Sequence, residues 1–161
     1  MAERPALNAS PLIFLARANL LDFLQLVGPE IVVPSPVADE IRREGPQDPA
    51  AQALETIPWL RVVEPPPVPA VIQSWDLGAG ESSVLTWAYA HRGTLAIVDD
   101  LAARRCAAAL NVPVRGTLGL VLLAKQHGRV EAARPVLQAM RASGMYLSDE
   151  VLNRALALVH E

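Results

Sequence analysis

The chain has 161 residues, of which 52% are hydrophobic and 19% charged, and its formal net charge is −3 at pH 7. This length is enough for a domain with a substantial core, and the apolar content excludes an intrinsically disordered chain. The acidic balance argues against a simple nucleic-acid binder, because proteins that hold phosphates by charge alone are usually basic. Lys125 is the only lysine, so positive charge comes almost entirely from arginine, which pairs with phosphate through a planar guanidinium.

Cys106 is the only cysteine, so no disulfide can form within the chain, as is typical of proteins from a reducing compartment. Its place in an apolar helical run predicts a small core side chain rather than a nucleophile. The N-terminal residues lack the apolar stretch of a secretion signal. The apolar run 118–124 is too short to cross a bilayer. We therefore expect a soluble, cytoplasmic protein that makes no contact with membranes.

Short β-like runs alternate with helical segments along the chain. Apolar, partly β-branched runs predict strands, in chain order at 5–8, 30–34, 59–64, 94–100 and 112–116. Helical spacing of apolar residues predicts helices, at 10–28 in one or two pieces, 35–45, 48–56, 77–93, 101–111, 117–128, 130–144 and 148–161. The proline run 65–69 cannot form regular structure and is predicted as a surface connection.

Capping residues set several of the expected helix boundaries. We expect Ser10, Ser35 and Ser148 to begin their helices, because a serine oxygen accepts hydrogen bonds from the free backbone amides of a first turn. A proline follows Ser10 and another follows Ser35, and proline fits the first helical position. Within 130–144, Pro135 either kinks the helix or marks its true start.

The alternation of strands and helices favours an α/β fold with a parallel sheet covered on both faces. Neither an internal repeat nor a second domain is visible, so residues 1–161 are predicted as a single domain. Connections between parallel strands are right-handed, so the carboxyl ends of the strands gather at one edge. Ligand chemistry is expected at that edge.

Glu40 stands out because it shares a helical face with two apolar residues. Val37 and Ile41 lie three residues before it and one residue after it, and both should face the core. Glu40 is therefore expected on or beside the inward stripe. Glu44 lies one turn further along and is expected to be solvated.

Three further acids stand where a strand or an apolar stripe begins or ends. Glu81 begins a stripe that continues through Val84 and Leu85, although a carboxylate in a first turn also stabilises the helix dipole. Asp99 and Asp100 end an apolar strand, although aspartate is also common in turns after strands.

Considered together, these acids come from three separate elements and are directed at or near apolar faces. Ionised carboxylates that converge are costly unless a cation neutralises them. A hard divalent cation such as Mg²⁺ takes oxygen ligands and is often shared with a substrate phosphate. Such a metal activates water and polarises a phosphoryl group. The pattern predicts a nuclease-like site.

Other chemistries fit the sequence less well. The three histidines lie at or near the ends of predicted helices and are scattered, and no Cys or His spacing is typical of zinc. The glycines at 78–80 are too few for a dinucleotide fingerprint, and no phosphate-binding P-loop motif occurs. A small-molecule phosphatase with Asp99 or Asp100 as its nucleophile stays open as a weaker alternative.

Several stretches resemble the PIN-domain family, and more closely its DUF3368 branch of VapC-like toxin ribonucleases. The most specific block runs from Asp99 to Gly128. The stretches that carry the resemblance are LNASPLIFLARANLLDFL, IVVPSPVADEI, LGAGESSVLTWA, AIVDDLAARRCAAALNVPVRGTLGLVLLAKQHG and SDEVLNRAL. They keep their order and spacing over nearly the whole chain.

The resemblance implies a three-layer α/β/α PIN-like domain with a central, mainly parallel sheet. It implies cleavage of RNA that depends on Mg²⁺ or Mn²⁺, usually by the toxin of a type II toxin–antitoxin pair. The implied partners are an RNA substrate, a cognate antitoxin that blocks the site and a second copy in a homodimer. The apolar closing helices offer either a surface for such partners or additional core.

Carried over by position, the acidic sites of the family fall on Asn8, Glu40, Glu81 and Asp100, with Asp99 beside the last. The resemblance thus implies that these residues are catalytic and hold the metal. Asn8 departs from the pattern, because its amide oxygen can bind a metal but brings no negative charge. The alternative is a non-catalytic PIN-like module that binds RNA or a protein.

Polar residues near these acids are weaker candidates for substrate binding. They are Ser10, Arg104, Arg105 and Thr117. The two arginines follow Asp100 by about one helical turn and would flank the site, and Arg42, Arg43 and Arg115 are further possible phosphate contacts. Ion pairs on solvated helix faces are an equal alternative for the arginines, as an N-cap role is for Thr117.

Overall fold

The computed structural model describes residues 4–161. Five strands form one sheet in the order β3-β2-β1-β4-β5, and every neighbouring pair is parallel. The strands are β1 (Ala6–Leu7), β2 (Ile31–Pro34), β3 (Leu60–Val63), β4 (Ala96–Ile97) and β5 (Val114–Arg115). The predicted α/β fold with a central parallel sheet is confirmed, although each strand is shorter than predicted.

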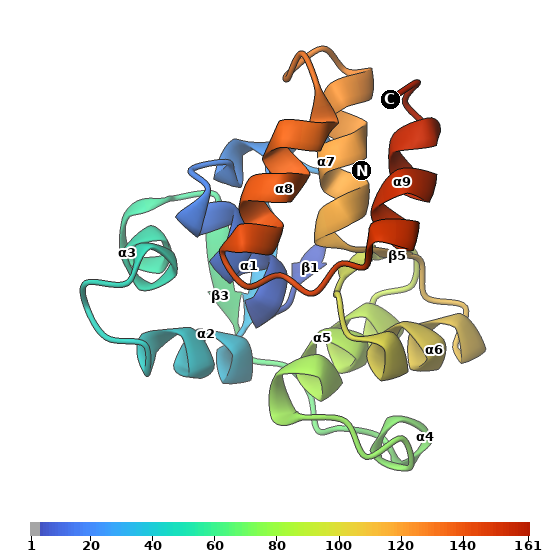
Figure 1. The fold of residues 1–161 in the computed structure, drawn as a ribbon. Helices are drawn as coiled ribbons and strands as arrows, with labels where there is room; N and C mark the ends of the chain where they lie inside the picture. The colour runs from blue at the N-terminus through green and yellow to red at the C-terminus, as the bar shows by residue number, and fades with distance from the viewer. Residues whose placement is uncertain (1–3) are drawn as a thin grey trace.

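Helices lie on both sides of this sheet (Figure 1). They are α1 (Ala9–Arg17), the 3-10 helix η1 (Leu21–Leu26), α2 (Ser35–Arg42), α3 (Pro49–Thr56), α4 (Ala70–Gln73), α5 (Ala79–Ala90), α6 (Leu101–Ala109), α7 (Thr117–Gln126), α8 (Ala133–Ala142) and α9 (Asp149–Ala157). The segment predicted at 10–28 is thus two helices. The short α4 was not predicted, because four residues carry too little periodicity.

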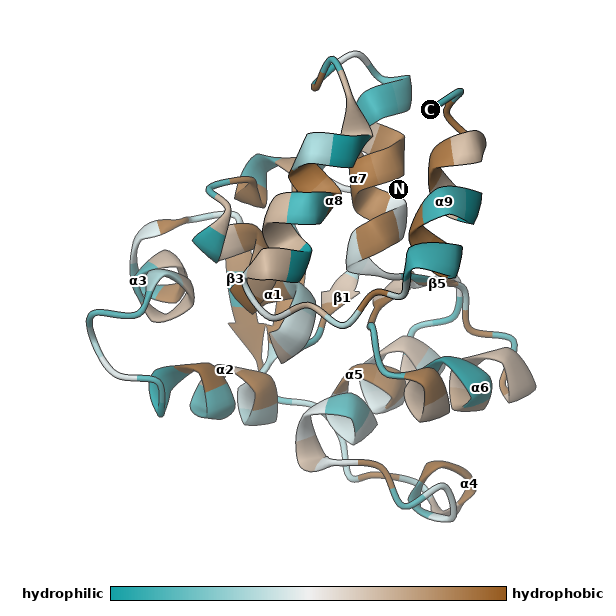
Figure 2. Ribbon diagram, in the orientation of Figure 1, coloured by the Kyte–Doolittle hydropathy of each residue, from teal (hydrophilic) through white to brown (hydrophobic). Residues whose placement is uncertain are grey.

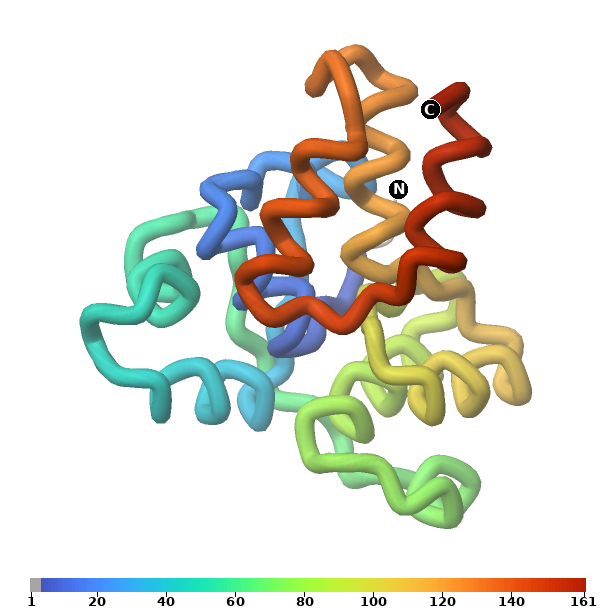
Figure 3. The backbone as a smooth tube through the Cα atoms, viewed as in Figure 1, coloured from blue at the N-terminus to red at the C-terminus, as the bar shows by residue number. Residues whose placement is uncertain are grey.

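The closing helices pack on α7, which is apolar along most of its length in Figure 2. Each of α8 and α9 contacts α7, and the two also contact each other. The tube in Figure 3 shows this last part of the chain running as a layer apart from α5 and α6. Buried residues of α8 and α9, such as Leu137 and Leu152, join the core.

Central strands are buried on both faces, as the apolar runs predicted. Ala6 and Leu7 of β1 and Ala96 and Ile97 of β4 are fully covered. Because β1 lies between β2 and β4, its carboxyl end is at the middle of the sheet edge. Asn8 follows β1 and directly precedes helix α1, so it lies at that central position.

Two of the predicted serine caps are wrong, and one is confirmed. Helix α2 begins at Ser35 itself, and the Ser35 hydroxyl donates to Glu64 Oε2 at 2.8 Å instead of capping the helix. Helix α1 begins at Ala9, so Ser10 lies inside its first turn. Ser148 caps α9 by accepting from the Val151 amide at 3.2 Å.

Cys106 is fully buried in the core, as predicted. Burial raises the pKa of its thiol above the ordinary value of 9.0, so little thiolate is present at neutral pH. Within residues 4–161, no helix has both the length and the apolar character needed to span a bilayer.

The first turn of α8 is held by a carboxylate from the far end of the chain. Glu161 accepts hydrogen bonds from the amides of Ala133 at 2.6 Å and Arg134 at 3.1 Å, and it pairs with Lys125 of α7 at 3.7 Å. Pro135 lies within this first turn, so it marks the start of the helix rather than a kink. The contact joins α7, α8 and the segment after α9.

Glu161→Gln is expected to destabilise the fold at neutral pH, because glutamine accepts a hydrogen bond but brings no charge. The pKa of Glu161 is lowered from 4.5, chiefly by the Ala133 amide and further by the Arg134 amide and nearby cations. Stability from a lowered pKa is present above the unfolded value and is lost as pH falls through the folded one. Urea unfolding should show a gap between variant and wild type at pH 7 that closes at acidic pH, below the ordinary glutamate pKa of 4.5.

Glu150→Gln is the matched control, since Glu150 lies on the exposed face of α9 in an i, i+4 pair with Arg154. Such exposed pairs contribute little, so this variant should unfold like wild type at both pH values. An equal loss for both glutamates would contradict the specific role of Glu161.

Candidate functional site

A cavity of about 620 Å³ opens at the carboxyl edge of the sheet. Six of the predicted site residues line it: Asn8, Ser10, Glu81, Asp99, Asp100 and Arg104. They come from the ends of β1 and β4 and from the first turns of α1, α5 and α6. This is the edge where the parallel topology predicts ligand chemistry.

Asn8 lies deepest in this group, with only 3% of its surface exposed. Its backbone amide donates to the Ile97 carbonyl of β4 at 3.0 Å, which fixes the residue at the sheet edge. Its side-chain Oδ1 has no hydrogen-bond partner among residues 4–161. An unsatisfied buried acceptor costs about 1–3 kcal/mol, so this oxygen marks a place where a ligand would be stabilising.

Gly80 brings Asn8 and Glu40 to the same point. A Cβ atom at Gly80 would lie 3.0 Å from Glu40 Oε2 and 3.1 Å from Asn8 Oδ1. Any side chain there would push these two oxygens away, so the first turn of α5 approaches them only because residue 80 is glycine. Gly80 was not predicted as a site residue, because the glycines at 78–80 are too few for a dinucleotide fingerprint and no other motif includes them.

Glu40 carries the clearest electrostatic sign of a crowded acidic site. The residue as a whole is exposed, but its Oε2 packs against the backbone of Gly80. Burial raises the pKa of Glu40 above 4.5, the neighbouring Glu81 raises it further, and Arg43 partly offsets both. The carboxylates of Glu40 and Glu81 therefore repel each other, although only Glu81 lines the cavity, and a bound cation would relieve this repulsion.

Glu81 lines the cavity from the first turn of α5. Its Oε2 lies 2.6 Å from the position that a Cβ would take at Gly78, so the side chain turns back over the start of its own helix. This position suits a favourable interaction with the helix dipole. It also leaves the carboxylate close enough to Glu40 to affect the pKa of that residue.

Asp99 is held by three donors from two other elements. The backbone amide and the hydroxyl of Thr117 donate to Oδ1 and Oδ2, each at 2.7 Å, and the Ser10 hydroxyl donates to Oδ2 at 3.2 Å. Gly116 is the N-cap of α7, so an N-cap role for Thr117 is wrong. Thr117 and Ser10 instead fix the orientation of the Asp99 carboxylate.

Asp100 caps α6, because its Oδ2 accepts from the Ala103 amide at 2.9 Å. The residue is exposed and lines the cavity beside Asp99. Its capping bond fixes the direction of the side chain at the site. A structural role and a ligand role are therefore compatible for this carboxylate.

The carboxylate and amide oxygens at this edge are the type of ligand that a hard divalent cation prefers. Asn8 Oδ1 and Glu40 Oε2 both lie beside Gly80, and Asn8 Oδ1 has no hydrogen-bond partner within residues 4–161. Mg²⁺ takes such oxygens while keeping several waters. Across residues 4–161, however, no three His, Cys, Asp or Glu side chains are grouped so that they could hold a metal ion.

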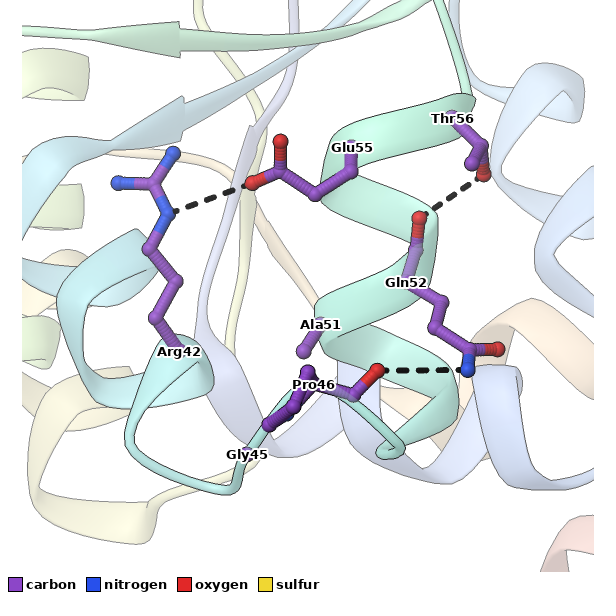
Figure 4. Close-up of a pocket in the computed structure, with 7 residues that line it drawn as sticks. All are labelled: Arg42, Gly45, Pro46, Ala51, Gln52, Glu55 and Thr56. Atoms are coloured by element: carbon purple, nitrogen blue, oxygen red, sulfur yellow. Dashed lines mark hydrogen bonds and ion pairs between the residues drawn. The ribbon is translucent and has the colours of Figure 1, made fainter.

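The arginines divide between the cavity and the outer surface. Arg104 is half-buried and lines the cavity, where its Nη1 lies 2.7 Å from the Cβ position of Gly116. Arg105 is exposed and does not line it. Arg42 lies beside a separate pocket and pairs with Glu55 at 3.7 Å (Figure 4). The ion pair with Glu55 therefore accounts for the position of the Arg42 side chain. The Arg104 guanidinium instead lies at the cavity wall, where a phosphate in the cavity would reach it.

The fold and this edge define an α/β protein with an acidic, oxygen-rich site at the carboxyl ends of parallel strands. The sequence profile of a family described as PIN domain, DUF3368, matches residues 5–161. The chain therefore belongs to the PIN-domain family, whose members are generally nucleases and typically use divalent metals. No curated protein matches the chain.

Thr117→Val is expected to destabilise the protein by about 1.5–3 kcal/mol, because it removes a hydrogen bond to a charged carboxylate in a fully buried position. Thr117→Ser keeps the hydroxyl and should lose less. Urea unfolding of both variants measures the difference. A valine variant as stable as wild type, together with a destabilised serine variant, would mean that the γ-methyl group rather than the bond to Asp99 makes the contribution.

Proposed function

We propose that this protein is an endoribonuclease that hydrolyses RNA phosphodiesters with water activated by Mg²⁺ or Mn²⁺. The observation that carries the proposal is the buried Oδ1 of Asn8, which has no hydrogen-bond partner among residues 4–161 and lies, like Glu40 Oε2, beside Gly80. Membership of the PIN-domain family supports the nuclease class. RNA as the substrate rests on the resemblance to VapC-like ribonucleases.

In this proposal, Glu40, Glu81, Asp100 and Asp99 would hold the metal directly or through water, and Asn8 would position the metal or a water ligand. Because no three acids among residues 4–161 are grouped closely enough to hold a metal on their own, the proposal includes contacts through water. When bound, the metal supplies a Lewis acid for the phosphoryl group and lowers the pKa of a bound water. Thr117 and Ser10 keep the Asp99 carboxylate in one orientation, and both belong to the proposal as positioning residues.

Arg104 is proposed to bind a phosphate of the RNA. Its guanidinium lies at the cavity wall beside Gly116, and arginine binds phosphate oxygens bidentately. Arg105 is exposed at the next position of α6 and is proposed as a more distant phosphate contact. A cationic side chain inside an acidic site suits a substrate that carries its own negative charge.

We extend the proposal to the toxin of a type II toxin–antitoxin pair, acting in the cytoplasm and assembling as a homodimer. The quoted motifs of the DUF3368 branch support this reading. Leu158, which follows α9, is 69% exposed and offers an apolar contact for an antitoxin or a second copy. A short reading frame that overlaps the gene on its upstream side would support the toxin assignment.

Glu40→Gln is expected to reduce metal-dependent RNA cleavage by about a hundredfold or more, because a bound metal contributes several kcal/mol of transition-state stabilisation. Glu44→Gln is the matched control, since Glu44 lies one turn further along the same stripe and is exposed. The measurement is cleavage of a varied RNA panel with Mg²⁺, with Mn²⁺ and with EDTA. Cleavage that persists in EDTA would contradict the proposal.

Asn8→Asp tests the neutral residue at the centre of the edge. The added charge should strengthen metal binding by about tenfold, since cation affinity rises with the charge of the ligands. Half-maximal cleavage should therefore need less Mn²⁺ than in wild type. Asn8→Ala, which removes the oxygen, should need more.

The Asn8→Asp variant also distinguishes between the two functions that the sequence left open, a ribonuclease and a non-catalytic binding module. Cleavage by wild type that is lost in Asp100→Asn supports the ribonuclease. A wild type that is inert on every RNA, together with cleavage by Asn8→Asp, would instead support a non-catalytic PIN-like binding module.

A further inference from the structure

Tyr146 stands fully in solvent at the mouth of the candidate site. It lies between α8 and α9, is 95% exposed, and lines the same cavity as Asp99 and Asp100. Figure 1 shows this connection crossing in front of the strand ends, between α1 and α6. An exposed aromatic ring that lines a polar cavity is available for contact with a ligand in that cavity.

The backbone around Tyr146 is anchored on both sides. Met145 and Leu147 are buried. The Met145 amide donates to the Met140 carbonyl at 3.1 Å, and Arg141 donates to the Leu147 carbonyl at 3.3 Å. The ring therefore projects from a fixed piece of chain, which lowers the entropy lost when it holds a ligand.

Leu101 extends this apolar rim on the side of α6. It directly follows Asp100, is 60% exposed and lines the same cavity. The cavity thus has apolar side chains at its mouth, acids at the sheet edge and the Arg104 guanidinium at its wall. An occupant that matches all three has a flat apolar face and a phosphate close to it.

A nucleotide of unpaired RNA has this combination. Bases in a duplex are stacked on one another and cannot offer a free face, whereas unpaired bases stack readily on tyrosine rings. An apolar protein segment would cover Tyr146 and Leu101 but would leave the charge of Arg104 without a match. The chemistry of the cavity therefore favours single-stranded RNA over a protein.

We propose that Tyr146 is a stacking platform for an unpaired base beside the phosphate at the candidate site. Leu101 extends the platform, and Arg104 binds the adjacent phosphate. This proposal rests on the proposed function for the identity of the substrate class, but it concerns binding rather than cleavage.

Binding of a fluorescein-labelled single-stranded oligoribonucleotide to the full chain, followed by anisotropy in EDTA, tests the platform without cleavage. Tyr146→Ala should weaken binding about tenfold, in keeping with the loss of one base–aromatic stack. Tyr146→Phe should bind like wild type, because the ring and not the hydroxyl makes the contact. The same oligonucleotide in a duplex should bind more weakly than the single strand and should not respond to Tyr146→Ala.

Val71→Ala is the matched control, since Val71 of α4 is also an exposed apolar residue but lies outside this cavity. It should leave RNA binding unchanged. The platform is overturned if wild type does not bind the single strand, if Tyr146→Ala binds like wild type, or if Tyr146→Phe loses as much as alanine. If Tyr146→Ala changes the oligomeric state on gel filtration but binds RNA normally, Tyr146 belongs to a protein interface, and the stacking platform is also overturned.

Failure of the platform and failure of the proposed function give different results. A wild type that binds single strands through Tyr146 but cleaves none with Mg²⁺ or Mn²⁺ keeps the platform and removes the ribonuclease. A wild type that cleaves with metal, and whose Tyr146→Ala variant binds and cleaves normally, keeps the ribonuclease and removes the platform.

Discussion

The arrangement of the candidate site depends on the three hydrogen bonds that Asp99 accepts. They join the end of β4 to the first turns of α1 and α7, through Ser10 and Thr117. Gly116, the residue before Thr117, has no room for a side chain because Asp99 Oδ1 and Arg104 Nη1 approach it closely. A single carboxylate thus fixes the separation of the helices that line one side of the cavity, and it positions the guanidinium beside it.

Glu81 lines the cavity, and Glu40 lies next to it without lining the cavity. Burial and then the Glu81 carboxylate raise the pKa of Glu40, and Gly80 lets both Glu40 and Asn8 approach α5. A third ionised carboxylate at position 8 would be nearly fully buried beside them, at a large cost in the absence of a cation. Asparagine avoids that cost and still places an oxygen beside Gly80. Compared with an aspartate at the same position, Asn8 therefore stabilises the metal-free fold.

Periodicity predicted those features of the chain that depend on burial alone. Val37 and Ile41 face the core, as do Val84 and Leu85, and they carry Glu40 and Glu81 to the sheet edge. The caps failed where a distant acid competes for a serine, because Ser35 donates to Glu64 and Ser10 donates to Asp99. Local sequence rules do not contain such partners. The close approach at Gly80 and the exposure of Tyr146 likewise depend on how separate elements pack, and no pattern along the chain indicates them.

An acidic chain can recognise RNA if the contacts do not depend on a basic surface. At this site the phosphate would meet one arginine locally, whereas a base would meet the Tyr146 ring, whose stacking does not require charge. Asp99 and Asp100 follow β4 at the sheet edge, so their repulsion of a phosphate is strongest where a cation is proposed to bind. The net charge of −3 then disfavours non-specific adhesion to nucleic acid, because affinity arises only where the ring and the guanidinium act on the same nucleotide.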